Sequence, residues 1–193
     1  MTTIYGLLGS PRKNGNTATL LDQLFKGAAE AGATSTSLSA NTLQIHGCQG
    51  CMLCKSSGVC AVKDGMEEIY ANIDDADVVV FASPIYFGTI TAQLITVLHR
   101  LYAYLRTDFT CRLAPGKTAV LLLTQGNPQA DAFAGYAEIL SGMLKRIGFA
   151  QVEILLAPGL RDRAAASKEP ALLASAYALG KRLASTDRPV VID

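Results

Sequence analysis

Apolar and polar residues alternate in blocks along the chain, and the length of each block predicts one strand or one helix. Residues 3–9, 77–82, 117–124 and 152–157 form short, nearly continuous apolar runs, which are typical of strands buried on both faces of a parallel sheet. A weaker stretch rich in Ser and Thr, at 33–45, is a further strand candidate. Helical spacing of apolar residues predicts helices at about 16–32, 64–73, 90–106, 130–147 and 170–183.

The predicted strands and helices follow one another in a βαβαβ order. Parallel strands need crossover connections, and helices usually make them. We therefore predict one α/β domain over residues 1–193, with helices on both faces of a five-stranded parallel sheet and a cysteine-rich insertion at about 46–62. Ligands of such sheets bind beyond the carboxyl ends of the strands. The loops 9–16, 83–89 and 124–128 all reach that edge, which makes it the predicted ligand site.

Charge and hydropathy narrow the class of protein further. Apolar residues make up 50% of the chain, 17 Lys and Arg stand against 16 Asp and Glu, and no long block carries one sign. This balance leaves no electrostatic footprint for nucleic acid or a membrane surface. The sequence has no secretory signal pattern and no apolar run near the ~20 residues of a membrane helix. We expect a cytoplasmic protein that binds neither nucleic acid nor membrane.

The link between the predicted first strand and first helix has the chemistry of a phosphate-binding loop. Ser10, Asn16 and Thr17 carry side-chain donors, and a helix beginning near Asn16 points its positive end at the same place. Gly15 allows backbone N–H groups to come close to an anion, and Arg12 adds a planar charged fork. We predict a cradle for a single terminal phosphate; the alternative is that a loop of this composition is simply a good turn.

Two common nucleotide-binding motifs are excluded in this loop. A Walker A loop needs G-x-x-x-x-G-K-[ST], but Asn14 stands at the place of the second glycine, and no Lys-Ser or Lys-Thr pair follows. The dinucleotide fingerprint G-x-G-x-x-G is absent as well. With both motifs excluded, the loop is predicted to hold a single terminal phosphate.

Four of the five cysteines form a tight cluster with the spacing C-x2-C-x2-C-x5-C. In a reducing compartment such a cluster is more typical of a metal site than of disulfides. Thiolates bind both iron–sulfur clusters and zinc, but structural zinc sites more often pair two C-x2-C knuckles across a longer gap. A third alternative is that the thiols hold no metal and are redox-reactive. The four residues are Cys48, Cys51, Cys54 and Cys60.

Two motifs together resemble the NADPH-dependent FMN reductase family of the flavodoxin-like superfamily: GSPRxxGNT at 9–17 and SPIYFG at 83–88. With the cysteine spacing added, the chain is similar to the iron–sulfur flavoprotein subgroup of that family. The resemblance implies a three-layer flavodoxin-like fold with strand order 2-1-3-4-5 and FMN as the cofactor. It also implies a [4Fe–4S] cluster on the four cysteines and a homodimer or tetramer, in which the cluster of one subunit approaches the flavin of its neighbour.

The resemblance further implies which residues bind the flavin. In that family the first loop holds the FMN phosphate, the second runs along the isoalloxazine ring, and a third lies on the flavin side. Carried over by position, the cofactor-binding residues are Ser10, Arg12, Asn14, Gly15, Asn16 and Thr17 in the first loop, Pro84, Ile85, Tyr86, Phe87 and Gly88 in the second, and Thr124, Gln125 and Gly126 in the third.

The expected activity is redox chemistry in which the flavin, and no catalytic side chain, carries the reaction. We expect electrons to come from NAD(P)H or ferredoxin and to pass through FMN, and through the cluster where it is present, to a small acceptor. Two alternatives from other classes remain at this point. One is a non-enzymatic electron carrier between protein partners, and the other is a redox sensor that uses the thiols.

Overall fold

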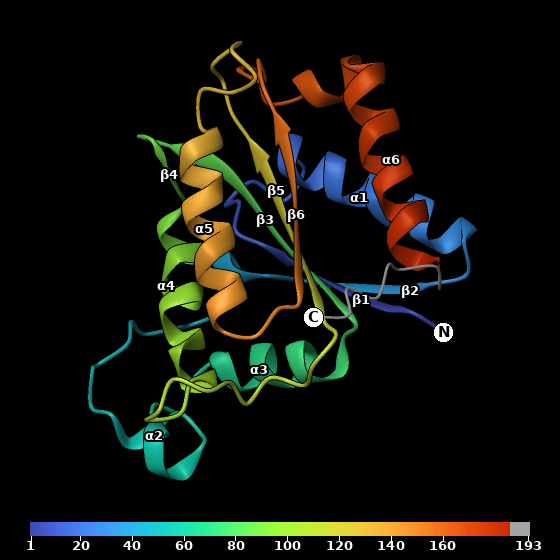
Figure 1. The fold of residues 1–193 in the computed structure, drawn as a ribbon. Helices are drawn as coiled ribbons and strands as arrows, with labels where there is room; N and C mark the ends of the chain where they lie inside the picture. Colours follow the sequence, from blue (N-terminus) through green and yellow to red (C-terminus); the bar gives the residue numbers. More distant parts are fainter. Residues whose placement is uncertain (186–193) are drawn as a thin grey trace.

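Figure 1 shows a central parallel sheet with helices packed against both of its faces. The structure is a computed structural model and describes residues 1–185; residues 186–193, the last part of the predicted domain, lie outside the described residues. The strands of the main sheet are β1 (Thr3–Leu8), β2 (Thr34–Ser39), β3 (Val78–Tyr86), β5 (Thr118–Thr124) and β6 (Gln151–Ala157). Their order is β2-β1-β3-β5-β6, and all neighbours are parallel, which confirms the predicted order 2-1-3-4-5.

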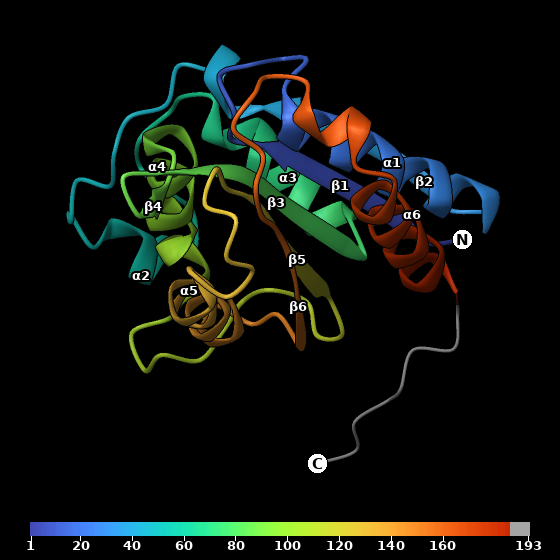
Figure 2. The same ribbon diagram turned by 90° about the horizontal axis from the view of Figure 1, so that it is seen from above.

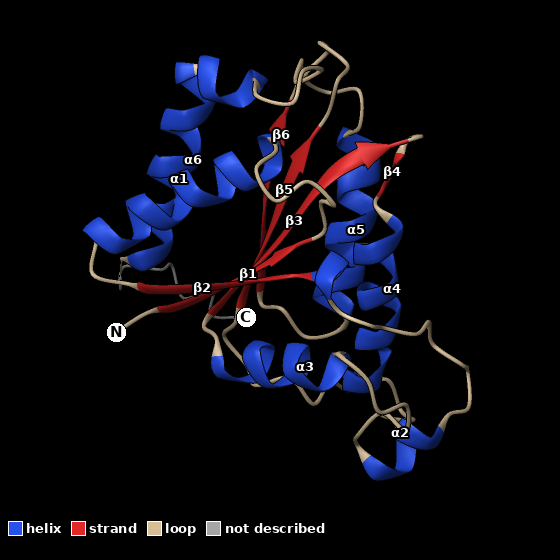
Figure 3. Cartoon of the chain, turned by 180° about the vertical axis from the view of Figure 1, so that it is seen from behind, coloured by secondary structure: helices blue, strands red, loops and turns tan. Residues whose placement is uncertain are grey.

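The helices divide between the two faces of the sheet (Figures 1 and 2). On one face α1 and α6 pack side by side, and on the other lie α3, α4 and α5. A short helix, α2, lies apart from the sheet in the cysteine-rich insertion, as Figure 3 also shows. The bounds are α1 (Asn16–Glu30), α2 (Leu53–Ser57), α3 (Met66–Asp75), α4 (Ala92–Arg100), α5 (Ala134–Arg146) and α6 (Pro170–Ala184).

Alternation along the strands divides the core into two clusters. In β1, Ile4 and Leu8 face α1 and α6, whereas Tyr5 and Leu7 face the helices of the other layer. Strands β3 and β5 are buried on both faces, which explains their unbroken apolar sequences. Because side chains of a strand alternate between faces, each apolar run contributes to both clusters at once.

The second loop of the predicted site differs from its expected form. Strand β3 does not end at residue 82 but continues to Tyr86, and it then pairs antiparallel with the short β4 (Thr89–Ile90). The predicted loop at 83–89 therefore contracts to a turn of Phe87 and Gly88, whose φ angles are +49° and +81°. Two positive φ values in a two-residue connection are the pattern of a type I′ hairpin turn.

Helix α4 is shorter than the predicted helix at 90–106. It begins after Thr91, whose hydroxyl accepts a hydrogen bond from the N–H of Leu94, and α-helical geometry gives way to a 3₁₀ turn at Leu101–Tyr104. In the same way, the predicted helix at 130–147 begins at Ala134. Within residues 1–185, the helices are all too short or too polar to cross a lipid bilayer.

Candidate cofactor sites

A pocket opens at the carboxyl edge of the sheet, between the loops that follow β1, β3, β5 and β6. Its volume is about 240 Å³. We call it the carboxyl-edge pocket; it is lined by Ser10, Arg12, Gly15, Asn16, Thr17, Pro84, Ile85, Tyr86, Thr124, Gly126, Leu160 and Arg161. The structure therefore brings together residues from all three loops that the sequence placed at one ligand site.

The first loop leaves β1 through a tightly packed glycine. The Gly9 N–H donates to the carbonyl of Ala82 at 2.7 Å, and the Thr91 hydroxyl donates to the Gly9 carbonyl at 2.7 Å. A Cβ at Gly9 would lie 2.7 Å from the Cβ of Leu94, so a larger residue would push the loop away from α4. The first loop is thus fixed to both β3 and the N-terminus of α4.

The N-terminus of α1 has the features of an anion site. No side chain caps the helix, whose N-cap residue is Gly15, and no acidic residue lies in its first turn. The free N–H groups and the positive end of the helix dipole therefore remain available to an anion in the carboxyl-edge pocket. Arg12 lies exposed at the rim of the same pocket and can add a guanidinium fork.

The three predicted side-chain donors of the first loop are not equivalent. Ser10 and Thr17 are buried at the pocket, where the Thr17 hydroxyl shares a 2.8 Å hydrogen bond with that of Thr124. Asn16 lines the pocket, but its amide nitrogen donates to the carbonyls of Leu160 and Asp162, and its side-chain oxygen accepts from a backbone N–H in the same region. Its carboxamide thus fixes the loop after β6, a role that the sequence did not suggest.

The second loop provides an apolar wall. Pro84, Ile85 and Tyr86 line the pocket at the end of β3, and a flat ring could lie against them. Phe87 and Gly88 form the hairpin turn beyond them and do not line the pocket. The side chain of Phe87 is fully exposed, which leaves it available to a partner rather than to the core.

Of the remaining predicted residues, some line the carboxyl-edge pocket and others lie outside its lining. Thr124 and Gly126 line the pocket, whereas Asn14 is exposed and outside its lining. Gln125 is buried beneath the third loop, where its amide nitrogen donates to the carbonyl of Gln129 at 3.1 Å. Gln125 therefore holds the shape of the loop instead of facing the pocket.

Sequence reasoning missed the loop that follows β6. Leu160 and Arg161 line the pocket, and the Arg161 Nε donates to the carbonyl of Gly126 at 3.1 Å. A signal was present, because Pro158 and Gly159 directly follow the last predicted strand and so also lie at the carboxyl edge of the sheet. Arg161 adds a second guanidinium to the pocket.

The four clustered cysteines line a second pocket. This small cavity of about 20 Å³ lies in the cysteine segment, which we define as residues 46–62, and it also touches Arg100 of α4. Among the described residues, no three His, Cys, Asp or Glu side chains lie close enough together to bind one metal ion. The cysteines thus surround a common space without converging on a single point. They are Cys48, Cys51, Cys54 and Cys60.

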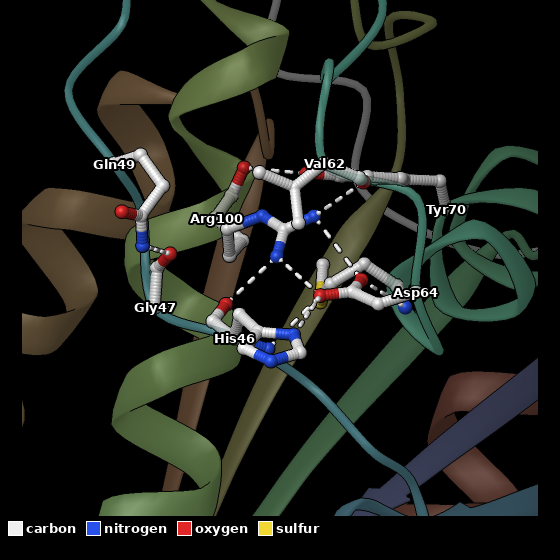
Figure 4. A network of polar contacts seen from close by, with 8 residues as sticks. His46, Gly47, Gln49, Val62, Asp64, Tyr70 and Arg100 are labelled. Carbon is white, nitrogen blue, oxygen red and sulfur yellow. Dashed lines mark hydrogen bonds and ion pairs between the residues drawn. The ribbon is translucent and has the colours of Figure 1, made fainter.

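An ion pair closes the cysteine segment at its base (Figure 4). Arg100 and Asp64 lie 2.8 Å apart, with 1% and 4% of their side chains exposed. Burial alone would raise the pKa of Asp64, but hydrogen bonds from Arg100 and from the N–H groups of His46 and Met66 lower it to about 2. Asp64 therefore stays ionised throughout the physiological pH range.

Basic residues also hold the outer part of the segment. The Lys55 ammonium on α2 donates to the carbonyls of Tyr102 and Leu105, at 2.7 Å each, and lies 3.3 Å from the centre of the Tyr102 ring. Arg112 donates from the other side to the carbonyl of Lys55 at 2.8 Å. These contacts join α2 to the 3₁₀ turn after α4.

The two sites lie at opposite ends of α4. Thr91, at the N-terminus of this helix, holds the first loop of the carboxyl-edge pocket, and Arg100, its last residue, holds the cysteine segment. Nine residues at 1.5 Å each separate the two ends by roughly 14 Å. Figure 3 shows the same separation, with β4 near one end of α4 and α2 near the other.

The sheet order and the pocket at its carboxyl edge define a flavodoxin-like protein with a ligand pocket at the end of its parallel strands. The sequence profile of the NADPH-dependent FMN reductase family matches residues 2–142, which include both loop motifs and the cysteine segment. The chain therefore belongs to the NADPH-dependent FMN reductase family. This membership confirms the family resemblance found in the sequence.

Curated relatives carry the name of the subgroup. The chain is similar to an iron–sulfur flavoprotein of Archaeoglobus fulgidus, with 32% identity over 147 residues that cover 76% of this chain and 64% of the relative. It is also similar to an iron–sulfur flavoprotein of Methanocaldococcus jannaschii, with 35% identity over 97 residues that cover 50% of each chain. The matched parts thus span between half and just under two thirds of these relatives.

A solved structure shares the fold over nearly the whole chain. It is an NAD(P)H:quinone oxidoreductase from Methanothermobacter marburgensis, with a TM-score of 0.77 and 19% identity, and the match covers 97% of this chain and 99% of that one. At this identity the likeness establishes the flavodoxin-like fold alone.

Proposed function

We propose that this protein is an FMN-dependent oxidoreductase that takes electrons from NAD(P)H or ferredoxin and delivers them to a small acceptor. The observation that carries the proposal is the carboxyl-edge pocket, in which the uncapped start of α1 lies beside the apolar end of β3. An anionic tail and a flat apolar ring are the two parts of FMN, and the pocket offers a surface for each. Membership of the FMN reductase family supports the same cofactor.

Individual residues of the pocket fit this cofactor. Arg12, Ser10 and the first N–H groups of α1 would hold the phosphate, and Pro84 and Ile85 would lie along the ring. FMN supplies one- and two-electron transfer when bound, so no general base is required of the protein. The chain's own residues bind the cofactor, orient its ring and exclude water from one side of it.

We further propose that the four cysteines hold a [4Fe–4S] cluster. Structural zinc sites more often pair two C-x2-C knuckles across a longer gap, whereas these cysteines have the spacing C-x2-C-x2-C-x5-C. Four thiolates are the ligand set of a [4Fe–4S] cluster, and all four cysteines line one cavity. The names of the curated relatives point the same way.

The subunits are proposed to form a homodimer or tetramer. Within one chain, α4 separates the cysteine segment from the carboxyl-edge pocket. Packing of two copies could bring the cluster of one close to the flavin of the other, as the family resemblance implies. Exposed apolar side chains near both sites support such contacts: Phe87 at the hairpin, and Met52, Leu53 and Val59 in the cysteine segment.

A binding experiment tests the flavin site. FMN is titrated into apoprotein, and quenching of its fluorescence gives the dissociation constant. The double variant Arg12→Ala/Thr17→Ala should weaken binding about 10- to 100-fold, or about 1.4–2.7 kcal/mol, because it removes a charged fork and a buried hydroxyl. Arg163→Ala is the matched control, since Arg163 is exposed and does not line the pocket. Unchanged affinity in the double variant would refute the phosphate assignment.

Anaerobic purification tests the electron path. The visible spectrum, with iron and sulfide assays, reports both cofactors, and fewer than about two irons per chain would contradict a four-iron cluster. Saturable bleaching of the flavin by NADPH or NADH would support a reductase. Reduction by ferredoxin, without reaction with either nucleotide, would favour an electron carrier. Protein that contains thiols but neither FMN nor iron would favour a redox sensor.

A further inference from the structure

Arg100 is the largest fully buried side chain among the described residues, although it carries a full charge. Placing a guanidinium in the interior is unfavourable unless its donors find acceptors. A hydrophobic residue at the end of α4 would fill the same space without this penalty. The contacts of Arg100 therefore indicate what the buried charge does for the protein.

The guanidinium of Arg100 makes four hydrogen bonds, two to the ends of the cysteine segment and two to Asp64 just beyond it (Figure 4). One terminal nitrogen, Nη1, donates to the carbonyl of His46 at 2.7 Å and to Asp64 at 2.8 Å. The other, Nη2, donates to the carbonyl of Val62 at 3.0 Å and to Asp64 at 3.2 Å. His46 begins the segment and Val62 ends it, so one side chain from α4 ties both ends to the same point.

The fifth donor of the guanidinium remains unused. The Nε of Arg100 is buried and finds no acceptor within residues 1–185. A buried donor without a partner is uncommon in a native structure and points to a missing partner. Arg100 also lines the pocket that the four cysteines line, so an anionic sulfur bound in that pocket can supply the missing acceptor.

We propose that Arg100 is a positioning residue of the cysteine pocket, which closes the cysteine segment at its base and offers its Nε–H to the sulfur atoms bound there. This inference rests on the proposed cluster. Hydrogen bonds and positive charge at the sulfur atoms raise the reduction potential of an iron–sulfur centre, because the reduced form is the more negative one. Arg100 thereby sets both the shape of the pocket and the potential of what it holds.

The test compares two variants of Arg100 with a charge control. Arg100→Lys keeps the positive charge beside Asp64 but removes the planar fork and the Nε–H. Arg100→Gln removes the charge as well. Lys63→Gln removes one charge next to Asp64 in the sequence, where Lys63 forms an exposed ion pair with Glu67. This variant leaves the contacts of Arg100 intact. The midpoint potential of the cluster is measured by anaerobic titration with electron paramagnetic resonance.

We expect a more negative potential in Arg100→Lys, a larger shift in the same direction in Arg100→Gln, and the wild-type value in Lys63→Gln. Wild-type potentials in the two Arg100 variants would overturn the proposed donation to sulfur, and so would a shift in Lys63→Gln equal to theirs. If Arg100→Gln does not fold, Arg100→Lys alone decides, because it retains a partner for Asp64.

Amide hydrogen exchange on the apoprotein separates this inference from the proposed cluster. Exchange across residues 44–66 should become faster in Arg100→Lys and remain unchanged in Lys63→Gln. If wild-type protein takes up no iron and sulfide, the cluster proposal fails, and the exchange measurement still judges the closing role of Arg100. Equal exchange in wild type and Arg100→Lys would overturn that role, whether or not a cluster is present.

Discussion

The carboxyl-edge pocket and the cysteine segment are built in different ways. The pocket consists of short loops, each fixed by the strand before it and, for the first loop, the helix after it, so the sheet order alone brings them together. The cysteine segment has little core of its own and contains only the single short helix α2. Its position depends chiefly on two buried cations: Arg100, which lies outside the segment, and Lys55, which lies within it. The pocket thus depends on topology, and the segment depends on a few specific polar contacts.

Replacing Arg100 should destabilise the protein far more than replacing the exposed Lys63 nearby. Arg100→Met leaves the Asp64 carboxylate buried without its cation, which should lower the free energy of unfolding by about 3–5 kcal/mol. Lys63→Met breaks only an exposed pair and should change it by less than about 1 kcal/mol. Urea unfolding measures both values. Similar losses in the two variants would mean that the buried pair is no more important than a surface one.

The same pair should make the segment sensitive to acid. Because the pKa of Asp64 is lowered to about 2 from its usual 3.8, its stabilising contribution is complete above about pH 4 and is lost as the pH falls toward 2. The lost contribution is about 2 kcal/mol. Unfolding free energies of wild type and Asp64→Asn, measured from pH 6 to pH 2, should therefore converge by that amount below pH 4. A constant difference over this range would contradict the ionic role of Asp64.

The fold and the meeting of the three loops at one edge of the sheet could be predicted because both depend on local patterns. Unbroken apolar runs marked β3 and β5, and Gly, Ser and Asn marked the loops at their ends. The supports of the cysteine segment could not be predicted in this way. Nothing near Arg100 in the sequence signals that it contacts His46, 54 residues away. The hairpin at Phe87 was missed because Phe is not a residue that favours a positive φ.

Arg161 reaches the carboxyl-edge pocket from a distant part of the chain, as Arg100 reaches the cysteine segment. Arg161→Met removes its guanidinium from the pocket and from the carbonyl of Gly126. We expect the dissociation constant of FMN to rise about 3- to 10-fold, or about 1 kcal/mol. Arg163→Met, outside the pocket, should leave the constant unchanged. Equal FMN dissociation constants in the two variants would show that Arg161 does not contribute to binding.

The smallest effect is expected at the hairpin beside the pocket. Phe87 adopts a left-handed conformation with its side chain fully exposed, so its ring adds no core packing within the chain. Asn tolerates this conformation better, and Phe87→Asn should raise the free energy of unfolding by about 0.5–1 kcal/mol in dilute protein. Phe87→Ala lacks the side-chain amide that lets Asn tolerate this conformation, and should show no such gain. A loss of stability in both variants that grows with protein concentration would instead mean that the ring is buried between two copies. The exposed ring would then be a part of the molecule that the contacts within one chain do not explain.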